Sequence, residues 1–256
     1  MLQTFSMKMT PFHTERTIRV YLPRDYFDSE AHYPVLYMHD GRNVFRDGDA
    51  IGGVSLGLEL YLEKTSLELI VVGIDAAASR EERIDEYCPW MNGAYSERII
   101  GYRQTMGGKG NAYVDFLVNE LKPRIDGTFR TRVHQTYLAG VSLGGLISSF
   151  AACQYPEVFR RVAGISSGFY RNQEKIEALL RESDLSLLER FYMDCGTEEA
   201  MGDPRISQEF VNSNKAIYDI VKSKVSHTHF QLVNGAAHNY SEFRKRIPDV
   251  FSFLFA

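Results

Sequence analysis

The stretch Thr136–Phe150, TYLAGVSLGGLISSF, places one serine between glycines at the junction of two sequence patterns. Residues 135–142 form a short apolar run typical of a buried strand, and the helix-like pattern after them stops before Pro156. G-x-S-x-G at such a junction is typical of a nucleophile elbow, where the glycines prevent clashes in a tight turn. The hydroxyl of Ser142 would then stand at a helix N-terminus, which favours developing negative charge. We expect Ser142 to be a nucleophile; the alternative is a plain helix N-cap.

Strand-like and helix-like patterns alternate along the rest of the chain, with no repeat and no long linker. Such alternation predicts an α/β fold with a mainly parallel central sheet and helices on both faces, as a single domain over residues 1–256. Residues 16–23 alternate polar and apolar side chains, which predicts an antiparallel hairpin at the N-terminus. The other expected strands are 33–41, 67–75, 135–142, 160–168, 189–199 and 227–239, and the expected helices are 110–126, 143–155, 207–224 and 240–255.

Reactive side chains follow the ends of several expected strands. They are His39-Asp40-Gly41, Ser142, Glu198-Glu199 and His238. In a parallel sheet, functional residues gather at the carboxyl ends of the strands, so these groups are expected to meet at one edge.

A serine hydroxyl needs an adjacent base, and in this order of elements the base comes late in the chain. His238 lies between the last strand and the last helix, where the alternative role is to cap that helix. An acid should follow a strand between Ser142 and His238 and orient the imidazole. Glu199 is favoured, ahead of Asp203 and then Glu198, although acidic residues are also ordinary in surface loops.

An oxyanion hole requires two preorganised backbone donors. The N–H of Leu143, directly after the serine, should be one of them. The other should come from the turn after the strand ending in HDG, with Gly41 favoured and Arg42 as the alternative.

Composition limits the possible partners. The chain has 256 residues, 44% of them hydrophobic, and a net charge of -4 without a basic stripe, which argues against nucleic acid as a partner. The basic run FRKRIPD, residues 243–249, is expected to be a solvated helix face. Cys88, Cys153 and Cys195 have no CxxC spacing, so we expect no disulfide or zinc site and a cytoplasmic setting. No apolar run is long enough for a signal peptide or a membrane span, which predicts no membrane partner.

Several stretches together resemble the putative esterase family of α/β-hydrolases, which includes enterochelin-esterase-like, feruloyl-esterase-like and esterase D groups. The resemblance runs from about residue 14 to residue 255 and rests on YPVLYMHDGRNVF (33–45), GGKGNAYVDFLVNELKPRIDGTFRT (107–131), YLAGVSLGGLISSFAACQYPEVFRRVAGISSGF (137–169), DCGTEE (194–199) and GAAHNYSEFRKRIPDVFSFLF (235–255).

This resemblance implies the α/β-hydrolase fold and a role for four residues. The elbow serine of the family corresponds to Ser142, and the histidine of its late G-x-x-H loop corresponds to His238. The acid after a G-T-x-[DE] strand end corresponds to Glu199, where an Asp is common in the family. The family's oxyanion loop corresponds to the HDG segment and therefore to Gly41.

Residues 79–110 resemble the stretch that covers the active site in relatives. They carry Arg83, Tyr87 and Trp90, the only tryptophan. An aromatic-rich loop at this place could bind an acyl or aryl group, and Trp90 could equally pack in the core.

The function that these residues predict is a serine esterase acting on a small-molecule carboxylic ester through an acyl-serine intermediate, with neither metal nor organic cofactor. One alternative keeps the triad and changes the chemistry to a thioesterase or acyltransferase similar to S-formylglutathione hydrolase. Another is a catalytically inactive α/β-hydrolase that binds a partner. Short acyl, aryl and siderophore-type esters all stay open as substrates, and so does the oligomeric state.

Overall fold

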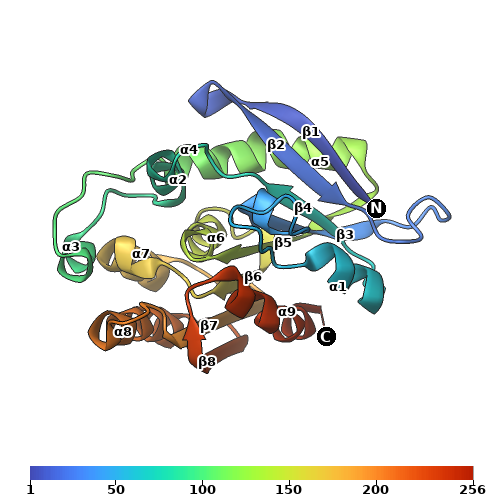
Figure 1. Ribbon diagram of the computed structural model, residues 1–256. Helices are drawn as coiled ribbons and strands as arrows, with labels where there is room; N and C mark the ends of the chain where they lie inside the picture. Colours follow the sequence, from blue (N-terminus) through green and yellow to red (C-terminus); the bar gives the residue numbers. More distant parts are fainter. Residues whose placement is uncertain (256) are drawn as a thin grey trace.

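The computed structural model describes residues 1–255, whose strands form one eight-stranded sheet in the order β1-β2-β4-β3-β5-β6-β7-β8 (Figure 1). β2 pairs antiparallel with β1 and with β4, and all other neighbours are parallel. The mainly parallel sheet with an antiparallel N-terminal hairpin is therefore confirmed. The strands are β1 Leu2–Met9, β2 Thr14–Tyr21, β3 Tyr33–His39, β4 Ile70–Ile74, β5 Thr131–Val141, β6 Phe159–Ile165, β7 Arg190–Glu198 and β8 His227–Ala237.

β1 is the first strand of the predicted hairpin, for which the sequence analysis gave no bounds. Phe5, Met7 and Met9 alternate with polar residues and pack against the core from this edge strand. Its partner β2 pairs with it residue for residue, from Leu2 opposite Tyr21 to Met9 opposite Thr14.

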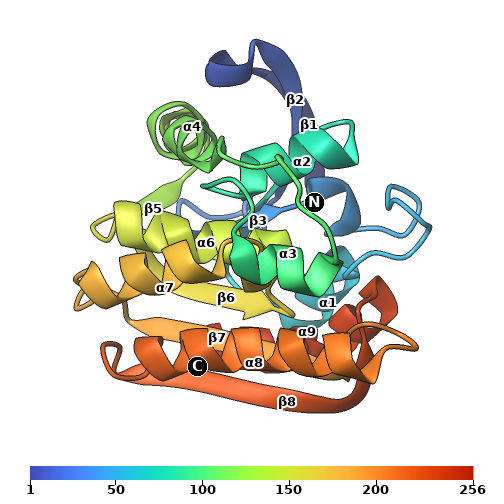
Figure 2. The same ribbon diagram turned by 90° about the vertical axis from the view of Figure 1, so that its left-hand side faces the viewer.

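Helices cover both faces of the sheet, as the alternation predicts (Figure 2). One hydrophobic cluster lies under α4, α5, α6, α7 and α8, and the other joins α1 and α9 to the opposite face. The α-helices are α1 Leu58–Thr65, α2 Arg80–Tyr87, α3 Ala94–Ile100, α4 Gly110–Phe116, α5 Lys122–Thr128, α6 Leu143–Gln154, α7 Gln173–Glu182, α8 Pro204–Val221 and α9 Tyr240–Phe255; the single turns are η1 Thr10–Phe12, η2 Gly41–Asn43, the π-helical η3 Leu117–Leu121 and η4 Phe169–Arg171.

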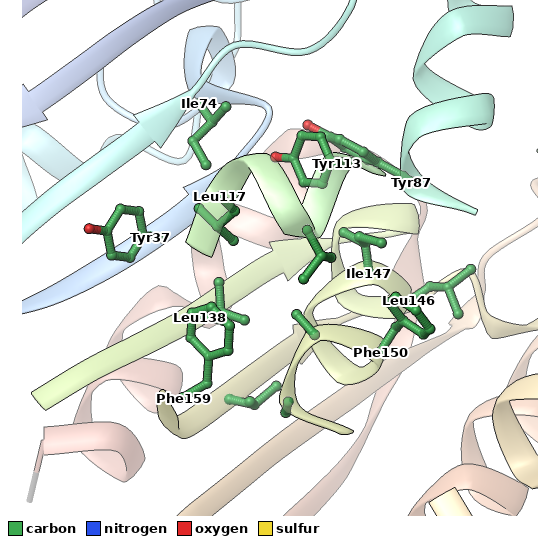
Figure 3. Packing of buried hydrophobic residues seen from close by; sticks show 14 of the residues in the cluster. Tyr37, Ile74, Tyr87, Tyr113, Leu117, Leu138, Leu146, Ile147, Phe150 and Phe159 are labelled. Carbon is green, nitrogen blue, oxygen red and sulfur yellow. The ribbon is translucent and has the colours of Figure 1, made fainter. Parts of the chain in front are cut away.

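Side chains from β5 and α6 meet in the core beneath the elbow (Figure 3). Leu138 of β5 and Leu146, Ile147 and Phe150 of α6 belong to the same hydrophobic cluster, in which Phe150 packs edge-on against Trp90. α6 ends at Gln154, just before Pro156, because proline cannot supply the N–H that would continue a helix. The elbow is therefore supported by one strand and one helix that are both buried.

The prediction that FRKRIPD is a solvated face is wrong for Arg246. Lys245 is exposed, but Arg246 is only 3% exposed because this side of α9 packs on the sheet. A buried guanidinium needs a counter-charge, and Asp194 of β7 supplies it at 2.7 Å.

Among the helices of residues 1–255, none combines the length and the apolar character that crossing a bilayer demands.

Candidate active site

Ser142 joins β5 to α6 in a backbone conformation that L-residues seldom adopt, with φ 58° and ψ -121°. A Cβ on Gly140 would lie 2.2 Å from the carbonyl carbon of Gly144, so position 140 must lack a side chain for the turn to close. The turn is tied to the end of β6, since the Ser142 amide donates to the carbonyl of Ile165 at 2.9 Å. This geometry has the form of a nucleophile elbow.

Glu199 and His238 come together at the carboxyl ends of β7 and β8. His238 Nδ1 lies 2.5 Å from Glu199 Oε2, with the Glu199 side chain 1% exposed and the His238 side chain 30% exposed. The rings of Phe210 and Phe243 flank the imidazole with centroids at 5.4 Å and 5.1 Å. One side of the ring is thus fixed by the acid and by aromatic contacts, while the other side reaches solvent.

The second oxygen of Glu199 is bound entirely within the protein. Glu199 Oε1 accepts hydrogen bonds from Ser166 Oγ at 2.5 Å and from the Gly196 amide at 2.6 Å. Burial raises the pKa of Glu199, but the hydrogen bonds from His238, Ser166 and Gly196 outweigh it, and the net shift is downward. Glu199 is therefore ionised near neutral pH, and its negative charge faces His238.

The other carboxylates of this region have different partners. Glu198 is exposed at the end of β7. Asp203 caps α8, where its side chain accepts from the Ile206 amide at 3.0 Å. Asp194 points into the protein toward Arg246. Of these carboxylates, the structure brings only Glu199 to His238.

Ser142 and His238 line the same cleft, whose volume is about 450 Å³. The cleft is completed by residues 76–80, by Tyr240 and Phe243, and by Arg83 of α2. Arg83 forms a bidentate ion pair with Asp40, in which Nε lies 2.6 Å from Oδ1 and Nη2 lies 2.8 Å from Oδ2. The sequence analysis placed Asp40 at a strand end and Arg83 in the covering segment, but it did not predict that the two side chains pair.

The predicted oxyanion residues lie at the two turns that border the cleft. Gly41 begins η2, where a Cβ would lie 2.6 Å from Asp75 Oδ1, and Leu143 begins α6. First residues of helices have no intrahelical acceptor for their N–H groups. Arg42, the alternative to Gly41, is the second residue of η2.

Tyr87 and Trp90, two of the aromatic residues of the segment 79–110, pack in or against the core. Trp90 packs edge-on against Phe150 with centroids at 5.3 Å, and Tyr87 is completely buried. Arg83 is the residue of the three that lines the cleft. Of the two roles considered for Trp90, the structure shows core packing.

His39, although it ends a strand, does not belong to the cleft. It is buried between Tyr113, whose hydroxyl lies 2.8 Å from Nδ1, and Ser148, whose Oγ lies 3.1 Å from Nε2. Burial lowers the pKa of His39 from 6.5 to about 4. His39 therefore stays neutral and links β3 to α4 and α6.

Comparisons with known proteins agree with this fold. Residues 10–254 match the family described as Putative esterase. The chain is 29% identical over 246 residues to the uncharacterized protein YbbA of Bacillus subtilis, covering 94% of this chain and 92% of YbbA. It also matches the structure of an IroE-like serine hydrolase from Shewanella oneidensis (TM-score 0.80, 18% identity, 99% of this chain and 80% of that chain). The siderophore hydrolase EstA from Aspergillus nidulans matches similarly (TM-score 0.76, 15% identity, 100% and 95%).

The structural matches show that the sheet and its helices form the α/β-hydrolase fold. The family match spans nearly the whole chain, from the N-terminal hairpin to the last helix. The chain therefore belongs to the Putative esterase family and is a carboxylic ester hydrolase.

Proposed function

We propose that this esterase uses Ser142, His238 and Glu199 as a catalytic triad on a small-molecule carboxylic ester. The observation that carries the proposal is the 2.5 Å hydrogen bond between His238 and the buried Glu199, beside the cleft that His238 shares with Ser142. The elbow conformation of Ser142 supports it independently.

The protonation of His238 follows from its partner. An ionised carboxylate only accepts hydrogen bonds, so Nδ1 carries the hydrogen and donates it to Glu199. In the neutral ring Nε2 is then without a hydrogen and can accept the proton of Ser142. Glu199 holds this tautomer and stabilises the imidazolium that forms when the proton is transferred.

The reaction proceeds in two halves. Ser142 Oγ attacks the ester carbonyl while His238 takes its proton, and His238 returns that proton to the leaving alcohol as the acyl-serine forms. His238 then takes a proton from a water molecule, whose oxygen attacks the acyl-serine carbonyl. The bond between the acyl carbon and Ser142 Oγ breaks, His238 returns the proton to Oγ, and the acid leaves. The backbone N–H groups of Leu143 and Gly41, with Arg42 as the alternative to Gly41, stabilise the tetrahedral oxyanion in both halves.

A cleft of about 450 Å³ suits a small-molecule ester, since such sites commonly measure about 300–1,000 Å³. Its walls combine the apolar Ile51, Val141 and Phe243 with the Asp40–Arg83 pair. A panel of p-nitrophenyl esters of increasing chain length, with a feruloyl ester and a siderophore lactone beside them, would rank the acyl groups by kcat/KM.

Ser142→Ala tests the mechanism directly. We expect it to lower kcat for p-nitrophenyl acetate by about 10⁵-fold or more and to abolish labelling by a fluorophosphonate. Ser149→Ala is the control, because Ser149 lies on the same helix, α6, is buried away from the cleft and donates to the Gly145 carbonyl. Normal turnover by Ser142→Ala would overturn the mechanism, provided that circular dichroism shows both variants folded.

A further inference from the structure

Ser166 directly follows β6, and its hydroxyl lies between the proposed acid, Glu199, and the buried guanidinium of Arg246. It is 0% exposed, and its φ of 46° is unusual for a residue other than glycine. Its Oγ lies 2.5 Å from Glu199 Oε1 on one side and 2.7 Å from Arg246 Nη1 on the other. Three elements far apart in the sequence therefore meet at one hydroxyl.

The direction of these two hydrogen bonds is determined by chemistry. A guanidinium has donors only, so Arg246 must donate to Ser166 Oγ. A serine hydroxyl has a single hydrogen, and Glu199 as a carboxylate can only accept it. The O–H of Ser166 consequently points at Glu199.

Arg246 is itself held in place by a second carboxylate. Its Nη1 also donates to Asp194 Oδ1 at 2.7 Å, and Asp194 is 0% exposed. Asp194 accepts two further hydrogen bonds, from the Ser166 amide at 3.2 Å and from the Tyr192 hydroxyl at 3.0 Å. Asp194 thus holds the nitrogen of Arg246, Nη1, that also donates to the Ser166 hydroxyl.

We propose that Ser166 is a positioning residue for the catalytic acid: oriented by Arg246, its hydroxyl holds Glu199 Oε1 and so directs Oε2 toward His238. This inference rests on the proposed function. It assigns Ser166 no contact with substrate, and its action passes through Glu199 to His238.

Removing the hydroxyl has two consequences for the acid. The carboxylate loses one of the bonds that fix its rotation, so His238 is oriented less firmly. Its negative charge is also shared among fewer donors, so Oε2 stabilises the imidazolium of His238 more strongly. The acid limb of the kcat/KM profile, which records protonation of the catalytic base, should therefore move to higher pH.

The other titratable or charged groups near Glu199 and His238 stay unchanged in the experiment. From β7, the thiol of Cys195 lies 3.7 Å from Glu199 Oε1, and Asp194 lies behind Ser166. α9 contributes Arg246, and the cleft side contributes the Asp40–Arg83 pair.

Ser166→Ala and Ser166→Gly provide the test, because both remove the hydroxyl but only glycine tolerates a φ of 46° without strain. We expect kcat to fall by roughly 10- to 100-fold in both variants, the factor that corresponds to the loss of one hydrogen bond to a charged group. KM for the p-nitrophenyl ester should not change. We expect the same fall, and the same upward shift of the acid limb, in both variants. Active sites are titrated with a fluorophosphonate, so that only folded molecules are counted.

Ser167→Ala is the matched control. Ser167 is the next residue, is equally buried, and its hydroxyl has no hydrogen-bond partner among residues 1–255. It should keep wild-type kcat and an unshifted acid limb.

Two results would overturn the inference: an unshifted acid limb in both Ser166 variants, or a loss in Ser166→Ala that Ser166→Gly restores, which would show that backbone strain is responsible. Failure of the proposed function would look different, because the wild-type protein itself would then neither hydrolyse the esters nor be labelled at Ser142.

Discussion

His39 and His238 both follow or end a strand at the same edge of the sheet, yet their surroundings differ. His39 is 3% exposed and hydrogen-bonds to two hydroxyl groups, those of Tyr113 and Ser148. His238 has a side chain that is 30% exposed and hydrogen-bonds to the carboxylate of Glu199. One ring joins neighbouring elements, and the other borders a cleft.

This difference shows that burial and the hydrogen-bond partner together determine whether a histidine ring can carry a positive charge. Burial lowers the pKa of His39 to about 4, and its two hydroxyl partners carry no charge that would offset this, so the ring stays neutral near neutral pH. A carboxylate partner stabilises the cation, which the proposed role of His238 as a base requires.

The largest effect should come from exchanging each histidine for glutamine. We expect His238→Gln to lower kcat/KM for a p-nitrophenyl ester by about 10⁵-fold, because the base is lost. His39→Gln should change kcat/KM by less than about tenfold, since an amide can also donate and accept hydrogen bonds. The comparison breaks if the two variants lose activity equally while both remain folded by circular dichroism.

A smaller effect should follow from making the partner of His238 neutral, like the partners of His39. Glu199→Gln should lower kcat by about 10⁴-fold, because the amide neither fixes the tautomer nor stabilises the imidazolium. Glu198→Gln and Asp203→Asn are the controls; the first is exposed and the second keeps an oxygen to cap α8. Either control losing as much activity as Glu199→Gln would move the acid to that position.

The smallest effect concerns stability against pH. Between pH 6.5 and about 4 an unfolded chain binds a proton at His39 that the folded protein does not, so the free energy of unfolding falls as the pH falls through this window. The full decrease is up to about 3 kcal/mol for this group. Measured by urea unfolding, the free energy of unfolding of His39→Gln should fall less between pH 7 and pH 4 than that of the wild type, by that amount. An equal fall in both proteins would show that His39 does not cause the decrease.

The chain positions of the proposed triad follow from local patterns. Ser142 is marked by glycines between a strand and a helix, and His238 by a loop between the last strand and the last helix. Glu199 was harder to select because three carboxylates follow one strand, and local sequence does not tell which of them turns inward. The Gly196 amide and the Ser166 hydroxyl, which bind Glu199, come from two different strand ends.

Arg246 and Arg83 show that a local sequence pattern does not predict which distant carboxylate a charged residue will pair with. Arg246 stands in a basic run that is typical of an exposed helix face, and it is buried because Asp194 lies 52 positions away in sequence but 2.7 Å away in space. Arg83 pairs with Asp40 across 43 positions, and this pair forms part of the cleft. Counter-charges of this kind are brought together only by the packing of strands and helices.

The sequence by itself determined the α/β architecture, the elbow at Ser142 and the chain order of the proposed serine, acid and histidine, because periodicity and glycine sterics act over a few residues. The tertiary structure alone decided which carboxylate meets His238, which histidine is buried among neutral groups, and how Ser166 and Arg246 reach Glu199. The physical reason is that hydrogen bonds and ion pairs act over about 3 Å, and only the folded sheet brings the ends of β6, β7 and β8 and the helix α9 within that distance.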